Sequence, residues 1–154
     1  PFWLKPRLEP RSPGMGNICI SRDDEPSQLA EQYERCYSLW QEVAAKLGDD
    51  GTLADECSGV YRDECRRLGV HQLSKRHWQE TTRLFVDRIS CGDPRTRERI
   101  YAAADRHCQG PGDRPISEGI FWEFTRLALS VAERDLRDRI SKMQERDPVA
   151  APAP

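Results

Sequence analysis

Six cysteines and three histidines carry the most versatile chemistry in this chain. The cysteines are Cys19, Cys36, Cys57, Cys65, Cys91 and Cys108, and no Cys-x-x-Cys motif occurs among them. Structural zinc takes four nitrogen or sulfur ligands, usually supplied in closely spaced pairs. His107 and Cys108 are adjacent, and adjacent helix residues point about 100° apart. A zinc site would need Cys65, Cys91, Cys108 and a histidine to meet through tertiary packing, and we predict none.

Nucleophilic catalysis is the second chemistry to consider, because a cysteine and a histidine need only meet in space to form a reactive pair. The sequence contains no nucleophile elbow, phosphate-binding loop, His-Glu-x-x-His motif or nucleotide fingerprint. The neighbouring acids Asp55 and Glu56, like Asp63 and Glu64, lie in segments rich in solvated charge. We therefore expect a protein that is not an enzyme.

The composition indicates a single domain with a modest core. The chain has 154 residues, of which 37% are hydrophobic and 32% are charged, so long charged faces should surround the apolar residues. The formal net charge is −2, and no dense basic stripe is present, so we expect no nucleic-acid partner. No run of about 20 apolar residues occurs, so the sequence predicts no membrane-spanning helix.

Apolar residues repeat at steps of three and four, which predicts an all-α fold of about five helices in a compact bundle. We expect one domain over residues 26–146 and no convincing strand. The predicted boundaries are a first helix from Pro26 to Leu47, a second capped by Thr52 and ended by Gly69, a third capped by Ser74, a fourth from Pro94 to Cys108, and a last one capped by Ser117.

The two ends are predicted to be irregular. Residues 1–25 contain four prolines, and residues 147–154 form a Pro/Ala tail without packing residues. The chain begins with Pro1 rather than Met, and its start lacks the apolar region of a signal peptide. We therefore expect a fragment, a processed product, or extraneous first residues.

A lipidation signal is one interpretation of the first segment. If translation starts at Met15, Gly16 would be the residue for myristoylation, and Cys19 lies close enough for palmitoylation. Ser21 stands one place later than the consensus requires. Two acyl chains would hold the protein at a membrane surface, which is a partner only in this case. A flexible arm is the alternative.

Two segments, residues 29–68 and 94–133, resemble degenerate EF-hands. The EF-hand is the calcium-binding helix-loop-helix family. In that family a twelve-residue loop carries its ligands at fixed positions, and an apolar residue at position 8 pairs with the partner loop. Asp50-Gly51-Thr52-Leu53 resembles positions 5 to 8, so the loop would run from Lys46 to Cys57. The resemblance implies pairing of Leu53 with Ile116. It also implies that this loop, with Asp50 as its good ligand, does not bind calcium.

The second segment resembles the same loop with an insertion. Asp105 resembles position 1 and Ile116-Ser117-Glu118 resembles positions 8 to 10, while Ile120 stands where the family has a bidentate glutamate. The resemblance implies one alternative function, a calcium sensor whose second loop binds the ion through Asp105, Asp113, Glu118 and main-chain carbonyls. Calcium is the one cofactor considered, and we otherwise expect none. An ordinary helical hairpin with a Gly/Pro turn fits the same residues.

The function that we predict is a non-catalytic protein-interaction or adaptor domain of degenerate EF-hand type. EF-hand pairs can hold an amphipathic helix of another protein in a groove, so such a helix is the implied partner. The candidate contact residues are Trp40, Phe121, Trp122 and Phe124. Helical periodicity assigns most of them to the core, but Trp122 lies off the apolar centre line of its helix.

The cysteines also bear on the compartment. Most fall on apolar faces of predicted helices, where a free cysteine behaves as a small hydrophobe. We therefore expect reduced thiols and an intracellular, cytoplasmic protein, at the membrane periphery if it is lipidated. A secreted protein stapled by disulfides is the alternative, since the number of cysteines is even.

Overall fold

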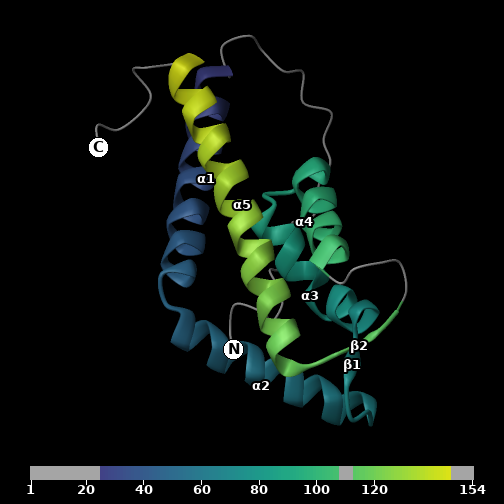
Figure 1. The fold of residues 1–154 in the computed structure, drawn as a ribbon. Coiled ribbons are helices and arrows are strands. Elements are labelled where there is room, and N and C mark those ends of the chain that lie inside the picture. The colour runs from purple at the N-terminus through teal and green to yellow at the C-terminus, as the bar shows by residue number, and fades with distance from the viewer. Residues whose placement is uncertain (1–24, 108–112, 147–154) are drawn as a thin grey trace, which may run out of the picture.

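The structure, a computed structural model, describes residues 25–107 and 113–146 (Figure 1). In this part of the chain five helices and two short strands follow one another. They are α1 (Glu25–Leu47), α2 (Asp50–Leu68), β1 (Leu73–Ser74), α3 (Lys75–Ile89), α4 (Pro94–His107), β2 (Pro115–Ile116) and α5 (Glu118–Arg146). The predicted all-α bundle is confirmed. The candidate lipidation residues Gly16 and Cys19, together with Cys108 and the Pro/Ala tail, lie outside the described residues.

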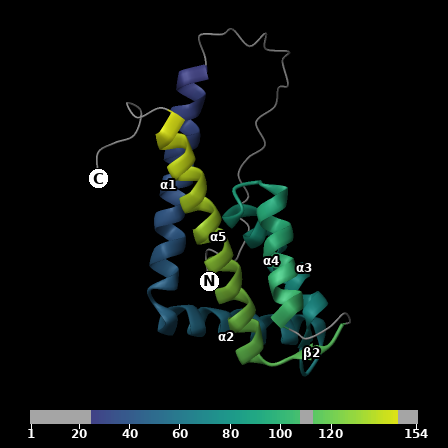
Figure 2. The ribbon, with the colours of Figure 1, turned by 45° about the horizontal axis from the view of Figure 1, so that its top comes forward.

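The longest helix, α5, is the centre of the fold. It packs against each of the other four helices. α1 runs antiparallel beside α5, α2 crosses below the start of α5, and α3 and α4 lie on the side opposite α1 (Figures 1 and 2). Within the described residues, no helix combines the length and the apolar character that a membrane span requires.

Local signals set most helix ends. Ser74 caps α3 through its hydroxyl, which accepts from the His77 N–H, while the His77 ring accepts from the Ser74 N–H. Gly69 ends α2 in the left-handed conformation that glycine adopts without strain. The predicted cap Thr52 is wrong: Asp49 caps α2 by accepting from the Thr52 N–H at 3.1 Å. α2 therefore begins three residues earlier, because an aspartate in that place is an equally good cap.

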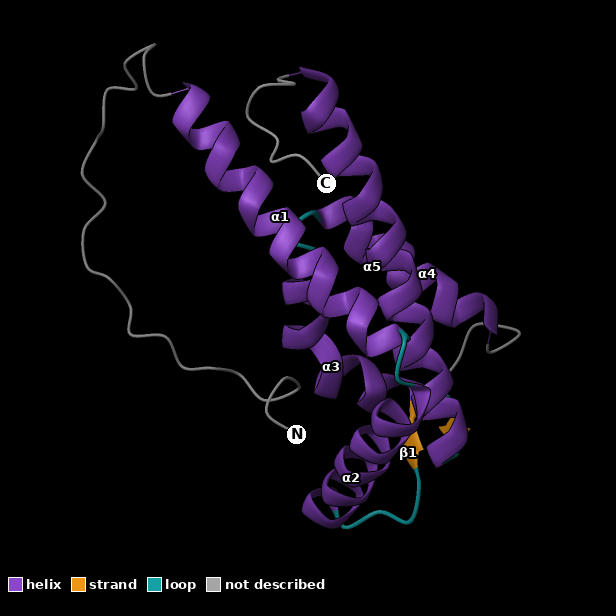
Figure 3. Ribbon diagram, turned by 90° about the vertical axis from the view of Figure 1, so that its left-hand side faces the viewer, coloured by secondary structure: helices purple, strands orange, loops and turns teal. Residues whose placement is uncertain are grey.

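A two-stranded antiparallel sheet pairs Leu73 with Ile116 and Ser74 with Pro115. Figure 3 shows these strands beside α2. The expectation of no strand is wrong, because two residues are too few to display the alternation by which a strand is recognised. The expected pairing of Leu53 with Ile116 is also wrong: Leu53 is a fully buried residue inside α2.

The sheet divides most of the chain into two helix-strand-helix units, α2–β1–α3 and α4–β2–α5. The second unit begins where the predicted segment 94–133 begins and extends beyond it to Arg146, while the first lies one helix later than the predicted segment 29–68. The residues expected to form a loop, Asp50-Gly51-Thr52-Leu53, form the first turn of α2 instead. α1 is thus additional to the two units.

Aromatic residues fill the space around α5. Trp78, Phe121 and Phe124 have no exposed surface, and the rings of Trp78 and Phe124 meet edge to face at 5.2 Å. The buried indole N–H of Trp78 donates to the Thr125 hydroxyl at 3.3 Å. From the other side α1 contributes Tyr33, Cys36 and Val43 to the same core. The core therefore joins α1 to both units.

Candidate functional site

The four candidate contact residues differ in how far they are exposed. Phe121 and Phe124 are fully buried, so they hold the core together and no partner can reach them in this structure. Trp40 is partly buried, and its indole N–H donates to Glu133 Oε1 at 2.9 Å, which ties α1 to α5. Trp122 is also partly buried, but it lies on the outer face of α5 at the edge of a cleft.

The cleft beside Trp122, here called the Trp122 cleft, has a volume of about 320 Å³. Five residues of α5 and the last residue of α4 form it: His107, Trp122, Glu123, Arg126, Leu127 and Ser130. His107 Nε2 lies 2.7 Å from Glu123 Oε2, and the His107 ring meets the edge of Phe124. The end of α4 is thereby held against α5, and the cleft is lined by apolar as well as polar side chains.

The indole N–H of Trp122 has no acceptor among the described residues, although its nitrogen is screened from solvent. A buried donor without a partner costs about 1–3 kcal/mol. The Arg126 guanidinium lies over the Trp122 ring, 5.9 Å from its centre, and Arg126 Nε donates to Asp50 Oδ1 at 2.9 Å. Trp122 is therefore an aromatic residue that packs against a partly exposed cationic side chain, and its hydrogen-bond donor has no acceptor among the described residues.

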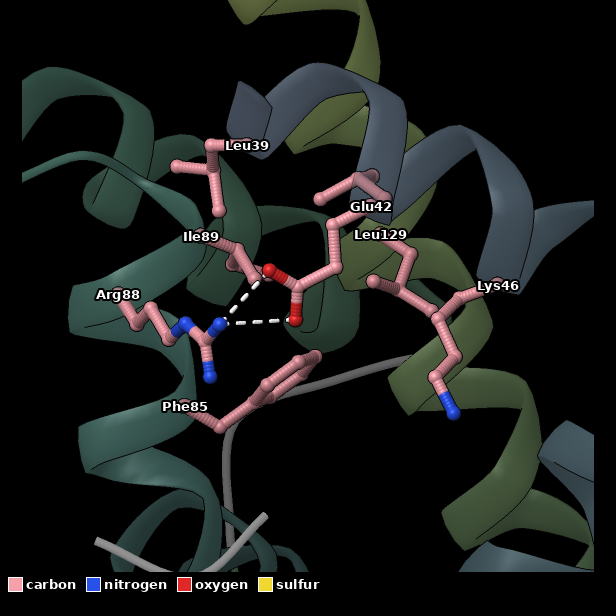
Figure 4. Close-up of a pocket in the computed structure, with 8 residues that line it drawn as sticks. Leu39, Glu42, Lys46, Phe85, Arg88, Ile89 and Leu129 are labelled. Atoms are coloured by element: carbon pink, nitrogen blue, oxygen red, sulfur yellow. Dashed lines mark hydrogen bonds and ion pairs between the residues drawn. The ribbon is translucent and has the colours of Figure 1, made fainter. Parts of the chain in front are cut away.

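A second apolar depression lies between α1 and α3 (Figure 4). Phe85, Ile89 and Leu129 line it, and an ion pair from Arg88 Nη2 to Glu42, at 2.7 and 2.9 Å, crosses its opening. The enclosed space is about 10 Å³, which is room for no more than one water molecule. This depression is a packed contact between helices and is too small for a ligand.

The three candidate calcium ligands point to different protein partners. Lys75 Nζ lies 2.7 Å from Asp105 Oδ1, and the N–H of Arg76 donates to Asp113 Oδ1 at 2.9 Å. The Ser58 hydroxyl and the Arg62 guanidinium both donate to Glu118. The bond from Ser58 holds the pKa of Glu118 below its usual value, and the Arg76 N–H does the same for the pKa of Asp113.

The first unit offers no calcium ligands of the kind that the resemblance implies. Counting from Leu73 as the paired apolar position 8, positions 1, 3 and 5 are Arg66, Leu68 and Val70. Calcium requires six to eight oxygen ligands, mostly carboxylates and carbonyls. Within residues 25–107 and 113–146, no three His, Cys, Asp or Glu side chains gather where they could hold a metal ion. The first unit therefore lacks the acidic ligands that the family carries at positions 1, 3 and 5.

One cluster of reactive side chains was not predicted. Cys36 Sγ on α1 lies 3.9 Å from Cys91 Sγ in the turn between α3 and α4. Both are free thiols, as are Cys57 and Cys65. The pair could not be predicted because the two residues are 55 positions apart and only tertiary packing joins them.

The chain was also compared with known proteins. No family model matches it, and searches of curated proteins and of solved structures give no match either.

Proposed function

We propose that this chain is a non-catalytic protein-interaction domain of degenerate EF-hand type, which binds an amphipathic helix of another protein at the Trp122 cleft. One observation carries the proposal: Trp122, a partly exposed tryptophan of α5, lines a cleft of about 320 Å³ between α5 and the end of α4. Tryptophan is enriched among residues that dominate binding energy, because it joins a large apolar surface to a hydrogen-bond donor.

The EF-hand-like part of the proposal is supported by the register of the sheet. Leu73 and Ile116 pair across it, and both are buried apolar residues, as the resemblance implies for position 8 of each loop. Ser74 and Ser117 then occupy position 9, and each caps the helix that leaves its loop. Two equivalent loops joined back to back, each followed by a capped helix, are the features that the family shares.

The outer face of α5 is the favoured binding surface because its inner face is already covered. α1 packs along α5, and the Trp40–Glu133 hydrogen bond and the Glu42–Arg88 ion pair hold it there. A partner helix on that side would have to displace α1. A partner helix bound at the Trp122 cleft would displace no helix of the described residues.

The chemistry of the cleft defines the partner. An apolar side chain of the partner would pack on Trp122 and Leu127, and a carboxylate beside it would accept from Arg126. The indole N–H is screened from solvent, so it becomes a second donor only when the side chains around it shift. Arg126 must turn away from the ring for this contact, and its side chain is 45% exposed, so it can exchange Asp50 for the partner. A helix with an apolar stripe flanked by Asp or Glu fits these requirements.

Selection from a displayed library of helical peptides tests the proposal without a known partner. The full chain should select peptides with an apolar stripe flanked by acids. Trp122→Ala should weaken their binding by at least about tenfold, as expected for a tryptophan at the centre of an interface. Trp122→Phe, which keeps an aromatic ring and removes the N–H, should weaken binding by about fivefold.

Leu84→Ala is the matched control, because Leu84 is an apolar residue of α3 that is 49% exposed and lies outside the cleft. It should leave the affinity unchanged, and circular dichroism should show all variants folded. Selected peptides that bind Trp122→Ala as tightly as the unchanged chain would exclude the Trp122 cleft as the binding site.

A further inference from the structure

The Cys36–Cys91 pair joins elements that are distant in sequence. Cys36 lies in the middle of α1 with no exposed surface, while Cys91 is partly exposed in the turn between Ile89 and Pro94. Their sulfur atoms are 3.9 Å apart. A disulfide requires about 2.05 Å, so the sulfurs must approach by about 2 Å. A movement of the turn that brings the two sulfur atoms together would therefore allow the disulfide to form.

The turn holds Cys91 in an uncommon conformation. Its φ is 52°, in the left-handed region that residues other than glycine rarely adopt, and Gly92 follows with φ 73°. The N–H of Cys91 donates to the Arg88 carbonyl at 2.9 Å, which fixes the turn to the end of α3. This backbone places the thiol of Cys91 over α1 and leaves part of the residue open to solvent.

The surroundings of the pair favour a thiolate on Cys91. The hydrogen bond from Cys36 lowers the pKa of Cys91 to about 6, and the positive charges of Arg139 and Arg35 act in the same direction against the effect of burial. The same hydrogen bond and burial raise the pKa of Cys36. The thiolate is the reactive form of cysteine toward oxidants and alkylating agents.

We propose that Cys36 and Cys91 are an oxidation site for hydroperoxides, at which a reversible disulfide fastens α1 to the turn between α3 and α4. The Cys91 thiolate attacks a peroxide oxygen; the O–O bond breaks, an alcohol or water leaves, and Cys91 becomes a sulfenic acid. Cys36 then attacks the Cys91 sulfur, the S–O bond breaks, and the hydroxide leaves as water with the Cys36 proton. Two thiols and one hydroperoxide give one disulfide, one alcohol and one water.

The other described cysteines do not share these properties. Cys57 is fully buried, and its burial raises its pKa to about 11, so it should react slowly. Cys65 is partly buried on α2, on a different element from the pair. Oxidation should therefore be selective, which distinguishes a built site from general damage to exposed thiols.

Peptide mapping of the full chain under non-reducing conditions, after treatment with hydrogen peroxide, tests the proposal. We expect a Cys36–Cys91 cross-linked peptide, and the six thiols of the chain falling to four. The bond should raise the melting temperature by on the order of 10 °C and disappear with dithiothreitol. Linkage of Cys91 to Cys108 or Cys19, or free Cys36 and Cys91 after oxidation, would overturn the proposal.

Two further measurements keep the test independent of one variant's folding. In Cys36→Ala, Cys91 should stop at the sulfenic acid and react with dimedone, whereas Cys57→Ala should still form the cross-link. In the unchanged chain, alkylation of Cys91 by iodoacetamide should rise with a midpoint near pH 6. At pH 6 it should be about tenfold faster than for the same cysteine in urea. A midpoint above pH 8 would contradict the role assigned to Cys91.

Discussion

At the scale of single residues, the Tyr61 hydroxyl explains how a sheet of two short strands is kept in register. It donates to the Ile116 carbonyl at 2.9 Å and accepts from the Leu73 N–H at 3.4 Å. Leu73 and Ile116 are the paired residues of β1 and β2, so one side chain of α2 contacts both strands. Burial raises the pKa of Tyr61, in keeping with a neutral hydroxyl that serves as donor and acceptor.

Tyr61→Phe should destabilise the protein by about 1–3 kcal/mol, because it leaves two buried backbone groups without that partner. Urea unfolding followed by circular dichroism measures the change. Tyr101→Phe is the matched control, since Tyr101 packs its ring against Trp78 and contacts neither strand residue. Equal losses for the two variants would mean that the Tyr61 hydroxyl does not hold the strands.

Calcium should not bind to the three carboxylates Asp105, Asp113 and Glu118. Each already accepts from a different protein donor, and the ion would have to replace Lys75, Arg76 and Ser58 or Arg62. Calorimetric titration at millimolar calcium should give no heat, and the melting temperature should not move. Saturable heat that Asp113→Asn abolishes would establish the calcium-sensor alternative instead.

At the scale of elements, helix caps and the sheet orient α3 and α5. Ser74 is both the last residue of β1 and the cap of α3, and the N–H of the next residue, Lys75, donates to the Arg114 carbonyl at 3.0 Å. Ser117 directly follows β2 and caps the start of α5. Each strand therefore fixes where the following helix begins, which in turn sets the position of Trp122 one turn into α5.

Ser74→Ala should cost about 0.5–2 kcal/mol, because it removes the acceptor for the His77 N–H at the start of α3. Ser141→Ala, an exposed serine within α5, is the control and should be neutral or slightly stabilising, since alanine is the better helix former. Denaturant midpoints compare the two. A Ser74→Ala variant as stable as the unchanged chain would contradict the role of the cap.

Helices could be predicted from the sequence because their signals are local. Gly69, Ser74 and Pro94 each mark a helix end within a few residues of where it occurs. Two other features could not be predicted, because they depend on how distant segments pack. They are the pairing of Leu73 with Ile116 and the contact between Cys36 and Cys91. For Trp122 one part could be predicted and another could not. Its position beside the apolar stripe of its helix predicted partial exposure, whereas the cleft that it forms with His107 depends on tertiary packing.

At the scale of the whole molecule, α5 has two faces with different tasks. Its inner face buries Phe121, Phe124 and Leu136 against both units and α1, and its outer face at the α4 side carries the Trp122 cleft. α1 closes the bundle on the remaining side, where the Cys36–Cys91 pair lies. The cleft proposed for partner binding is thus formed by α5 and the end of α4, and the cysteine pair proposed for oxidation by α1 and the turn between α3 and α4.

Amide hydrogen exchange with and without a selected helical peptide tests the central claim, that the Trp122 cleft is the binding surface, most directly. The peptide should slow exchange in the first four turns of α5 and at the end of α4, where the lining residues lie. Exchange in α1 should not change, because α1 need not move. Protection that is confined to α1 and α3, or faster exchange in α1 on binding, would contradict the account.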